Sequence, residues 1–378
     1  MGERVTTGTA ITGWGVWHPE AVLDNVELCQ AFNEFVRRDN AKHADAIARG
    51  EREGLKESSP EFIVKASGIE RRYVHDKTGL VDPDRMFPNI PDRPEEELSV
   101  QAEYALHAAR TALDVAGRSG DDVDYVVLGA SCLQRSYPAL AIEVQGQLGA
   151  RGHGVDISLG CATGTAALQL ASQAVQLGQA RCALVVLPEL TSPHLNWRER
   201  DGHFILGDAS VAIVIEPLAR AKGVAWEIRA TKMASKWSNN IRNNCGFINR
   251  CDPATVDAPD KLFHQHGRRV FKDVVPMAES FVRESIGALG LQPDQIARYW
   301  LHQANQNMNE LIAKRILGRD ATAAEAPMVL AEYGNTASAG SPIAFALHQD
   351  DLPIGSLGVM AAFGAGYSLG SLVLERAA

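Results

Sequence analysis

The chain has 378 residues, of which 46% are hydrophobic, and a formal net charge of −9 at neutral pH. This length predicts two or three domains, or one double domain with a large core. The acidic balance and the lack of a long basic run argue against nucleic acid as the main partner. No stretch of about 18 uninterrupted apolar residues occurs, so no membrane span is expected.

The cysteines do not form a framework. None is part of a C-x-x-C pair, so neither a zinc site nor a set of disulfides is expected. The first nine residues are polar and carry no apolar signal core. These features predict a cytoplasmic protein with reduced thiols.

The N-terminal region begins with a strand candidate at residues 9–16 and a helix candidate at residues 25–35. Residues 37–60 are charged and dotted with alanine and glycine, which is typical of an exposed helical insertion or a mobile loop. Residues 76–97 are acidic and rich in proline, which predicts a long loop of a kind that is often functional. No linker divides the chain into independent units.

Strands and helices alternate regularly from residue 99 onward. The apolar patterns predict a helix at 99–116, buried strands at 123–128 and 155–159, a helix at 162–175, and strands at 183–187 and 210–215. The second half repeats this order with a helix at 274–289, a strand at 297–301, a helix at 341–348, and strands at 356–363 and 368–374. We therefore expect an α/β fold of two pseudo-symmetric halves, residues 1–217 and 218–378.

Cys161 lies between the predicted strand 155–159 and the predicted helix 162–175. Free N–H groups and the helix dipole at such a turn favour an anion, so this thiol is expected to lose its proton readily. Gly160 and Gly164 leave the space around the sulfur open. A catalytic nucleophile is one interpretation, and a buried structural cysteine is the other.

Three further segments carry polar or turn residues near the ends of predicted strands, where α/β sheets place their sites. His302 follows a short apolar strand, Asn335 lies in Tyr-Gly-Asn-Thr, and a glycine turn at 364–366 joins the last two strands. Each also has a structural interpretation. His302 could be a core histidine, Asn335 could cap the next helix, and the glycine turn could allow close contact between strands.

The strings H-Q-A-N at 302–305, Y-G-N-T at 333–336 and F-G-x-G at 363–366 resemble those of the thiolase-fold condensing enzymes. The resemblance is closest to the β-ketoacyl-acyl-carrier-protein synthase III group and covers nearly the whole chain apart from the two insertions. It implies helices layered between and around two mixed sheets. It also implies a catalytic triad and an oxyanion hole made by two backbone amides. The triad would be Cys161, His302 and Asn335, and the amides those of Cys161 and Ala365.

These residue types suit the chemistry that the resemblance implies. A thiolate can accept an acyl group and release it again. Two backbone N–H groups stabilise the tetrahedral oxyanion. His302 and Asn335 would hold the thioester oxygen where charge develops as malonyl loses carbon dioxide. No metal or redox cofactor is needed.

The resemblance also places substrate and partner contacts. Tyr137 would reach across a homodimer into the acyl pocket of the other subunit, and Asn305 would contact substrate. Phe62 and Arg200 would contact coenzyme A. Two arginines of the group are replaced by Ala66 and Asn307. Lys272 and Lys314 would dock the carrier protein, although solvated helix charges explain them equally well.

The expected function is therefore a decarboxylating condensation. An acyl group from acyl-CoA would pass to Cys161 and condense with malonyl-acyl-carrier protein, giving a β-ketoacyl thioester for fatty-acid or related lipid synthesis. A specialised-metabolite ketosynthase or an acyltransferase of the same fold is the main alternative, and a non-catalytic partner subunit is a further one. Both insertions flank residues 62–72, so we expect them near the substrate entrance.

Overall fold

The computed structural model describes residues 8–377, apart from the side chain of Phe247. The N-terminal part contains β1 (Thr9–Trp17), β2 (Val22–Asp24), α1 (Asn25–Lys42), α2 (Ala44–Ala48), α3 (Pro60–Ser67), β3 (Arg71–Tyr73), α4 (Val100–Ala116), β4 (Tyr125–Gly129), α5 (Leu140–Leu148), β5 (His153–Ile157), α6 (Thr163–Gln176), β6 (Ala183–Glu189) and β7 (Ala209–Pro217). The C-terminal part contains β8 (Trp226–Ser238), β9 (Ile241–Arg242), β10 (His264–Gln265), α7 (Gly267–Gly287), β11 (Ile296–Leu301), α8 (Gln306–Leu317), α9 (Leu330–Tyr333), α10 (Gly340–Leu347), β12 (Leu357–Gly364) and β13 (Gly366–Arg376).

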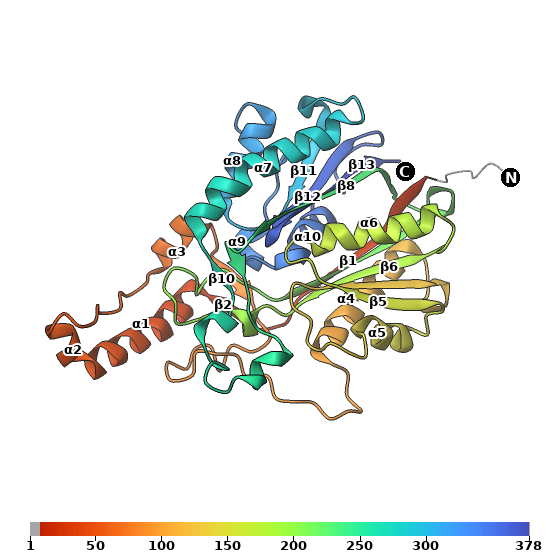
Figure 1. The fold of residues 1–378 in the computed structure, drawn as a ribbon. Coiled ribbons are helices and arrows are strands. Elements are labelled where there is room, and N and C mark those ends of the chain that lie inside the picture. The colour runs from red at the N-terminus through yellow and green to blue at the C-terminus, as the bar shows by residue number, and fades with distance from the viewer. Residues whose placement is uncertain (1–7, 378) are drawn as a thin grey trace.

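The main sheet runs in the order β11-β12-β13-β8-β1-β7-β6-β4-β5 (Figure 1). It is mixed, because β4 pairs in parallel with β5 and β6, and β11 with β12, while the other pairs are antiparallel. At its centre β1 and β8 are joined by two residue pairs, Ala10 with Glu227 and Ile11 with Trp226. The two mixed sheets expected from the resemblance are therefore present, and they meet at this narrow seam.

Helices form three layers around these two sheets (Figure 1). α4 and α5 pack on the outer face of the β4–β7 half in one apolar cluster, and α7 and α8 pack on the outer face of the β11–β13 half in another. α6 and α10 lie between the halves in the central cluster. The order β4, α6, β6, β7 recurs as β11, α10, β12, β13. The predicted pseudo-symmetric α/β fold is confirmed, whereas the boundary at residues 217 and 218 falls between β7 and β8 and stays a prediction.

α3 is fixed at both ends by local signals. Ser59 caps it by accepting a hydrogen bond from the N–H of Phe62 at 3.1 Å, and Pro60 begins its first turn. Gly68 ends it with φ of 81°, and a Cβ at this position would lie 2.2 Å from Oε1 of Gln306 in α8. Glycine is therefore required by both the backbone conformation and the contact with α8.

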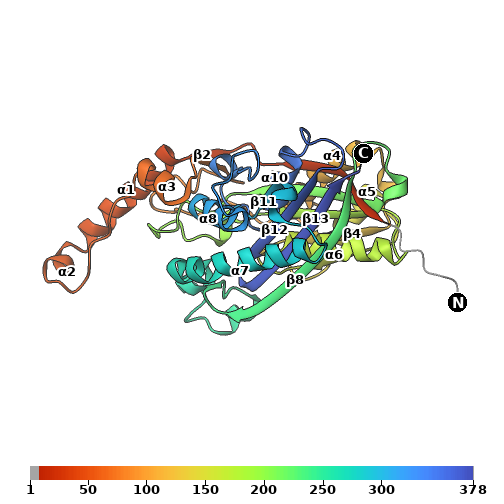
Figure 2. The ribbon, with the colours of Figure 1, turned by 90° about the horizontal axis from the view of Figure 1, so that it is seen from above.

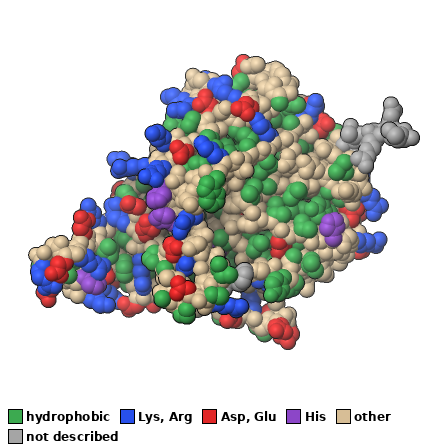
Figure 3. Space-filling view, viewed as in Figure 1, with side chains coloured by type: hydrophobic (Ala, Val, Ile, Leu, Met, Phe, Trp, Pro, Cys, Tyr) green, Lys and Arg blue, Asp and Glu red, His purple; other side chains and the backbone are tan. Residues whose placement is uncertain are grey.

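The first insertion forms an arm that projects away from the rest of the molecule (Figures 1, 2 and 3). α1 continues to Lys42, α2 forms the tip, and the chain then returns to α3. Asn40 joins the two sides of the arm, because its amide donates to the carbonyl of Leu55 at 2.9 Å and accepts from the N–H of Leu55 at 2.8 Å. Of the two interpretations of residues 37–60, the exposed helical insertion fits α1 and α2.

Two strands differ from the expectation. The strand near 155–159 is not buried, because β5 lies at the edge of the sheet and covers the central core with one face only. β8 has no counterpart among the predicted strands, although it joins the two halves.

The second insertion, 76–97, contains no helix or strand, as predicted. Within residues 8–377 no helix is long and apolar enough to cross a membrane.

Candidate active site

A cavity of about 1090 Å³ opens between the two halves of the molecule. Cys161, His302, Asn335 and Ala365 all line its wall. They come from the turn before α6, the end of β11, the loop after α9 and the turn between β12 and β13. Four segments that are distant in sequence therefore meet in one place, as the strand-end argument predicts.

The glycine turn at 364–366 lies directly against Cys161. A Cβ on Gly364 would lie 2.6 Å from Cβ and 3.2 Å from Sγ of Cys161. A Cβ on Gly160, which has φ of 54°, would lie 3.1 Å from Cβ and 3.6 Å from the backbone nitrogen of Ala365. The backbone of Ala365 is thus beside the cysteine, in the region where the predicted oxyanion hole requires it.

The thiol of Cys161 is not activated in the way expected from its place before a helix. Burial raises its pKa to about 12, and the neighbouring Glu189 and Cys132 add to this rise. The prediction of a readily ionised thiol is therefore wrong, because the cost of burying a thiolate exceeds the stabilisation from the backbone hydrogen bond at Cys161. At neutral pH Cys161 carries its proton.

His302 is held rigidly at the end of β11. The backbone N–H of His302 donates to the carbonyl of Ala361 at 2.8 Å. Its ring packs edge-on against the ring of Phe363, with the two centroids 5.6 Å apart. Burial lowers its pKa to about 4, although a hydrogen bond with the backbone of Ala337 acts in the opposite direction. The imidazole is therefore neutral at neutral pH and still has one N–H that can donate to a substrate oxygen.

The loop after α9 fixes the side chain of Asn335. Its N–H donates to the carbonyl of Ile205 at 2.9 Å, and its own carbonyl accepts from Gly207 at 3.2 Å. Its Oδ1 accepts from the N–H of Ala337 at 2.9 Å. This contact resembles the capping role considered as an alternative, and it uses the amide oxygen. The NH₂ group of Asn335 remains as the donor for the cavity.

The predicted coenzyme A contacts lie together beside the cavity. The guanidinium of Arg200 sits over the ring of Phe62 at 3.9 Å, and its Nε donates to the carbonyl of Glu57 at 2.7 Å. Asn305 lines the cavity and donates to the carbonyl of Ala66 at 2.6 Å. This bond links the start of α8 to α3. Ala66 supplies no charge at the position where the resemblance places an arginine.

The other predicted contacts are at the surface. Tyr137 is 85% exposed and does not line the cavity of its own chain, although Ser136 does. Lys272 is exposed on α7, one residue after the cavity-lining Phe271. Lys314 on α8 forms an exposed ion pair with Asp320 at 2.9 Å. These positions do not distinguish docking residues from solvated helix charges.

The insertions do not form the cavity wall, since all of its lining residues lie outside 37–60 and 76–97. The base of the first insertion does reach the predicted coenzyme A contacts through the bond from Arg200 to Glu57. The second insertion is tied to the arm by Arg38 and Asp84, whose side chains are 2.9 Å apart. The expectation that both insertions lie near the entrance thus applies to the base of the first.

Sequence reasoning missed the buried carboxylate of the cavity, Glu189. It is the last residue of β6 and follows a run of apolar residues. The rule that led to His302, a polar residue at the carboxyl end of a buried strand, would have identified it. Two more thiols, Cys132 and Cys245, also line the cavity and carried no sequence signal.

Two family models match the chain. The one described as 3-oxoacyl-[acyl-carrier-protein (ACP)] synthase III matches residues 155–236, and the one described as the C terminal of that synthase matches residues 286–376. A β-ketodecanoyl-[acyl-carrier-protein] synthase of Pseudomonas aeruginosa is 51% identical over 349 residues. The match covers 92% of this chain and 99% of that protein.

Solved structures share the fold of this chain. The 3-oxoacyl-(acyl carrier protein) synthase III of Pseudomonas aeruginosa PAO1 superposes with a TM-score of 0.76 at 23% identity and covers 98% of this chain and 99% of its own. The corresponding synthase of Aquifex aeolicus superposes with a TM-score of 0.74 at 25% identity, covering 97% and 100%. On the identity and coverage of its relatives, this chain belongs to the 3-oxoacyl-[acyl-carrier-protein] synthase III family of thiolase-fold condensing enzymes, which are acyltransferases.

Proposed function

We propose that Cys161 takes an acyl group from acyl-CoA and that the chain condenses it with malonyl-acyl-carrier protein. The observation that carries this proposal is the meeting of Cys161, His302, Asn335 and the turn 364–366 on one cavity. The cysteine sulfur forms a thioester, and the coenzyme A thiol leaves. The malonyl group then loses carbon dioxide, and its enolate carbon attacks the acyl thioester and releases the sulfur.

The chain's own groups have distinct roles in these steps. The backbone N–H groups of Cys161 and Ala365 stabilise the oxyanion of each tetrahedral intermediate. The NH₂ group of Asn335 and the neutral imidazole of His302 donate to the malonyl thioester oxygen as the enolate forms. Because both donors are uncharged, they stabilise the enolate by directed hydrogen bonds.

We propose a medium-chain starter of about eight carbons, since condensation with malonyl adds two carbons to the starter. The name of the 51% identical Pseudomonas aeruginosa relative states a β-ketodecanoyl product, which has ten carbons. A cavity of about 1090 Å³ is slightly larger than the usual small-molecule site of about 300–1,000 Å³. Its wall includes Leu133, Phe263, Val270, Phe271 and Met308. An apolar wall of this kind supports a hydrocarbon chain as the occupant.

We also propose a cytoplasmic homodimer. The free cysteines of the described residues, two of them exposed, support a reducing compartment. The unpaired edge of β5 and the exposed side chain of Tyr137 support association through that side of the molecule. Lys272 and Lys314 remain our candidates for docking the carrier protein.

The proposal is tested by intact-mass measurement after incubation with saturated acyl-CoAs of two to twelve carbons. We expect one acyl group per chain, with the greatest uptake near eight carbons. Cys161→Ala is expected to take up none, whereas Cys245→Ala, which removes another thiol of the same cavity, is expected to behave like the parent. Acylation that persists in Cys161→Ala, or that peaks at two carbons, would contradict the nucleophile or the starter, respectively.

A further inference from the structure

Glu189 is a buried carboxylate for which the mechanism above has no role. It is 1% exposed, it ends β6, and it lines the cavity together with Cys161. Its hydrogen-bond partners are two serines rather than a cation. A buried carboxylate is costly unless it is well hydrogen-bonded, so its partners indicate what it does.

Four donors converge on one oxygen of Glu189. Its Oε1 accepts from the N–H of Ser131 at 2.9 Å, from the hydroxyl of Ser131 at 3.0 Å and from the N–H of Ser338 at 3.0 Å. The hydroxyl of Ser338 is the fourth donor. Burial raises the pKa of Glu189, and the hydrogen bonds from Ser338 and Ser131 act in the opposite direction. In its ionised form the carboxylate only accepts hydrogen bonds, so it can satisfy four donors from two loops without needing an acceptor of its own.

On one side, Glu189 holds the turn that carries Asn335. Ser338 follows Ala337, whose φ of 46° is strained for a residue with a side chain. The N–H of this same Ala337 orients the amide of Asn335. A Cβ on Gly164 would lie 2.5 Å from the carbonyl oxygen of Ser338, so the turn also packs closely against α6, the helix that follows Cys161. Anchoring Ser338 therefore maintains the direction of the Asn335 NH₂ group.

On the other side, Glu189 holds the first residue of a loop in the cavity wall. Residues 131–136 all line the cavity and lead to Tyr137. Beyond Ser131 the loop is held by Gln101, which donates to the carbonyl of Cys132 at 2.9 Å and accepts from the N–H of Gln134 at 2.6 Å. Glu189 and Gln101 thus fix this stretch of wall at successive points.

We propose that Glu189 is a positioning residue that locks the cavity loop 131–136 to the Asn335 turn, so that an acyl chain on Cys161 and the donor for the enolate keep a fixed relation. This rests on the proposed function, because it takes Cys161 as the acyl acceptor and Asn335 as the enolate donor. Acyl capture needs only Cys161 and the two amides beside it. Decarboxylation and condensation need Asn335 and therefore depend more strongly on Glu189.

The test compares Glu189→Ala, Glu189→Gln and Ser338→Ala, measuring acylation by mass spectrometry and carbon dioxide release from labelled malonyl-acyl-carrier protein. In Glu189→Ala and Ser338→Ala we expect carbon dioxide release to fall by about 100-fold, the effect of a misplacement near 1 Å, while acylation falls much less. Glu189→Gln is expected to retain part of the release rate, since its amide oxygen can still accept from both serines. Glu216→Gln, a buried carboxylate outside the cavity, is the matched control and should leave the ratio of the two rates unchanged.

The ratio of the two rates and the partial recovery in Glu189→Gln separate this role from general structural support, which would lower both half-reactions together. The proposal is wrong if Glu189→Ala lowers both half-reactions by the same factor, or if its carbon dioxide release equals that of the parent. A parent protein that takes up no acyl group would instead overturn the proposed function.

Discussion

Cys161 and His302 face the cavity in their neutral forms, and the same physical cause acts on both. Burial disfavours the charged form, so it raises the pKa of the thiol to about 12 and lowers the pKa of the imidazole to about 4. The thiol must therefore lose its proton as the acyl group is attacked rather than before. The neutral imidazole keeps the N–H that the enolate oxygen needs.

A second buried histidine allows a prediction about stability and pH. Burial lowers the pKa of His203 to about 4, and its ring stacks on Phe32 with centroids 4.3 Å apart. In the unfolded chain this histidine has a pKa of about 6.5, so below that pH the unfolded state binds more protons and stability falls as pH falls. At pH 5 the loss from His203 is about 2 kcal/mol. His203→Phe keeps the ring stack and removes the titration.

Urea unfolding at pH 7.5 and at pH 5 measures this effect. We expect the parent to lose more stability than His203→Phe between the two values. His302 stays in both proteins and contributes equally to both. An equal loss in the two proteins would mean that His203 does not remain neutral in the folded state.

Gly364 supplies a residue-scale prediction for activity. A Cβ at this position would lie 2.6 Å from Cβ of Cys161, closer than real Cβ contacts, and the neighbouring atom is not the flexible end of a long side chain. Gly364→Ala should therefore displace Cys161 or the turn and lower acylation by about 100-fold, as expected for a 1 Å misplacement. Gly287→Ala, at the end of α7 where a Cβ meets nothing within 4 Å, should acylate at the parent rate. Equal acylation rates for the two variants would show that the turn accommodates the added methyl group without displacing Cys161.

The site residues were open to sequence reasoning to different degrees. His302 and Asn335 each lie in a short, specific string, and Cys161 lies at a predicted strand-to-helix turn. The structure shows that all three line one cavity. Glu189 has partners 58 and 149 positions away in sequence, and only the fold brings them together. The direction of the Cys161 pKa shift was wrong, because depth of burial is not visible in a local pattern.

At the scale of elements, the kind of burial decided what could be predicted. β4, β6 and β7 are buried on both faces and therefore read as continuous apolar runs. β8 was missed because it is largely half-exposed, and polar residues interrupt its apolar ones. β5 was predicted as a strand, but five residues carry no signal that separates an edge strand from a central one.

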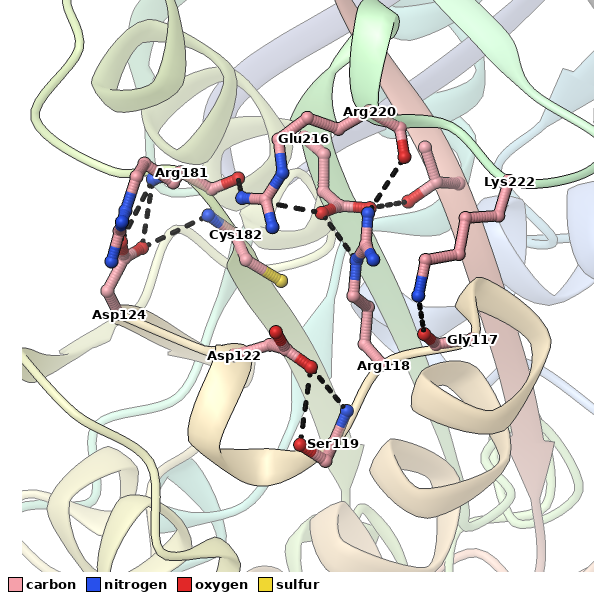
Figure 4. A network of polar contacts seen from close by, with 11 residues as sticks. Gly117, Arg118, Ser119, Asp122, Asp124, Arg181, Cys182, Glu216, Arg220 and Lys222 are labelled. Atoms are coloured by element: carbon pink, nitrogen blue, oxygen red, sulfur yellow. Dashed lines mark hydrogen bonds and ion pairs between the residues drawn. The ribbon is translucent and has the colours of Figure 1, made fainter.

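A buried ion pair joins Arg118, in the loop after α4, to Glu216 near the end of β7 (Figure 4). The two side chains are 6% and 0% exposed and 2.8 Å apart, and Thr12 of β1 also donates to Glu216 at 3.0 Å. Arg118→Met leaves a buried carboxylate without its main partner, and we expect a loss of about 3–5 kcal/mol in the free energy of unfolding.

Urea denaturation of Arg118→Met, Glu216→Leu and the double variant checks this prediction. The double variant should lose less than the sum of the two single variants, since it leaves no unpaired charge. Acylation of Cys161 should persist in the folded protein, because neither residue lines the cavity. Additive losses would mean that the pair contributes little as a pair.

At the scale of the whole molecule, the two insertions show what the sequence could not predict. Composition predicted either an exposed helical insertion or a mobile loop for the first and a long loop for the second. The structure shows α1 and α2 in the first and no helix or strand in the second. Their direction depends on contacts between distant residues, such as Arg38 with Asp84 and Arg198 with the carbonyl of Asp84 at 2.6 Å. As a result the arm extends outward, and only its base reaches the predicted coenzyme A contacts (Figure 2).

The side of the molecule at β5 carries apolar groups that a partner could cover. Tyr137 is 85% exposed, Ile142 on α5 is 52% exposed, and Leu159 after β5 is 38% exposed. A free strand edge beside exposed apolar side chains favours association. Two-fold dimers are also the commonest oligomers, and one patch used by both subunits is sufficient to form one.

We therefore expect light scattering coupled to size exclusion to give about twice the chain mass of 40.8 kDa at micromolar concentration. Ile142→Lys places a charge in the patch and should shift the protein toward monomer. Ile354→Lys changes an isoleucine that is 71% exposed in the loop before β12, and it should leave the dimer intact. Tyr137→Ala should keep the dimer but change the preferred acyl length, because the tyrosine would project into the partner's cavity. A monomeric parent would contradict the proposed dimer. A Tyr137→Ala dimer with the parent's chain-length profile would show that Tyr137 does not contact the partner's acyl pocket.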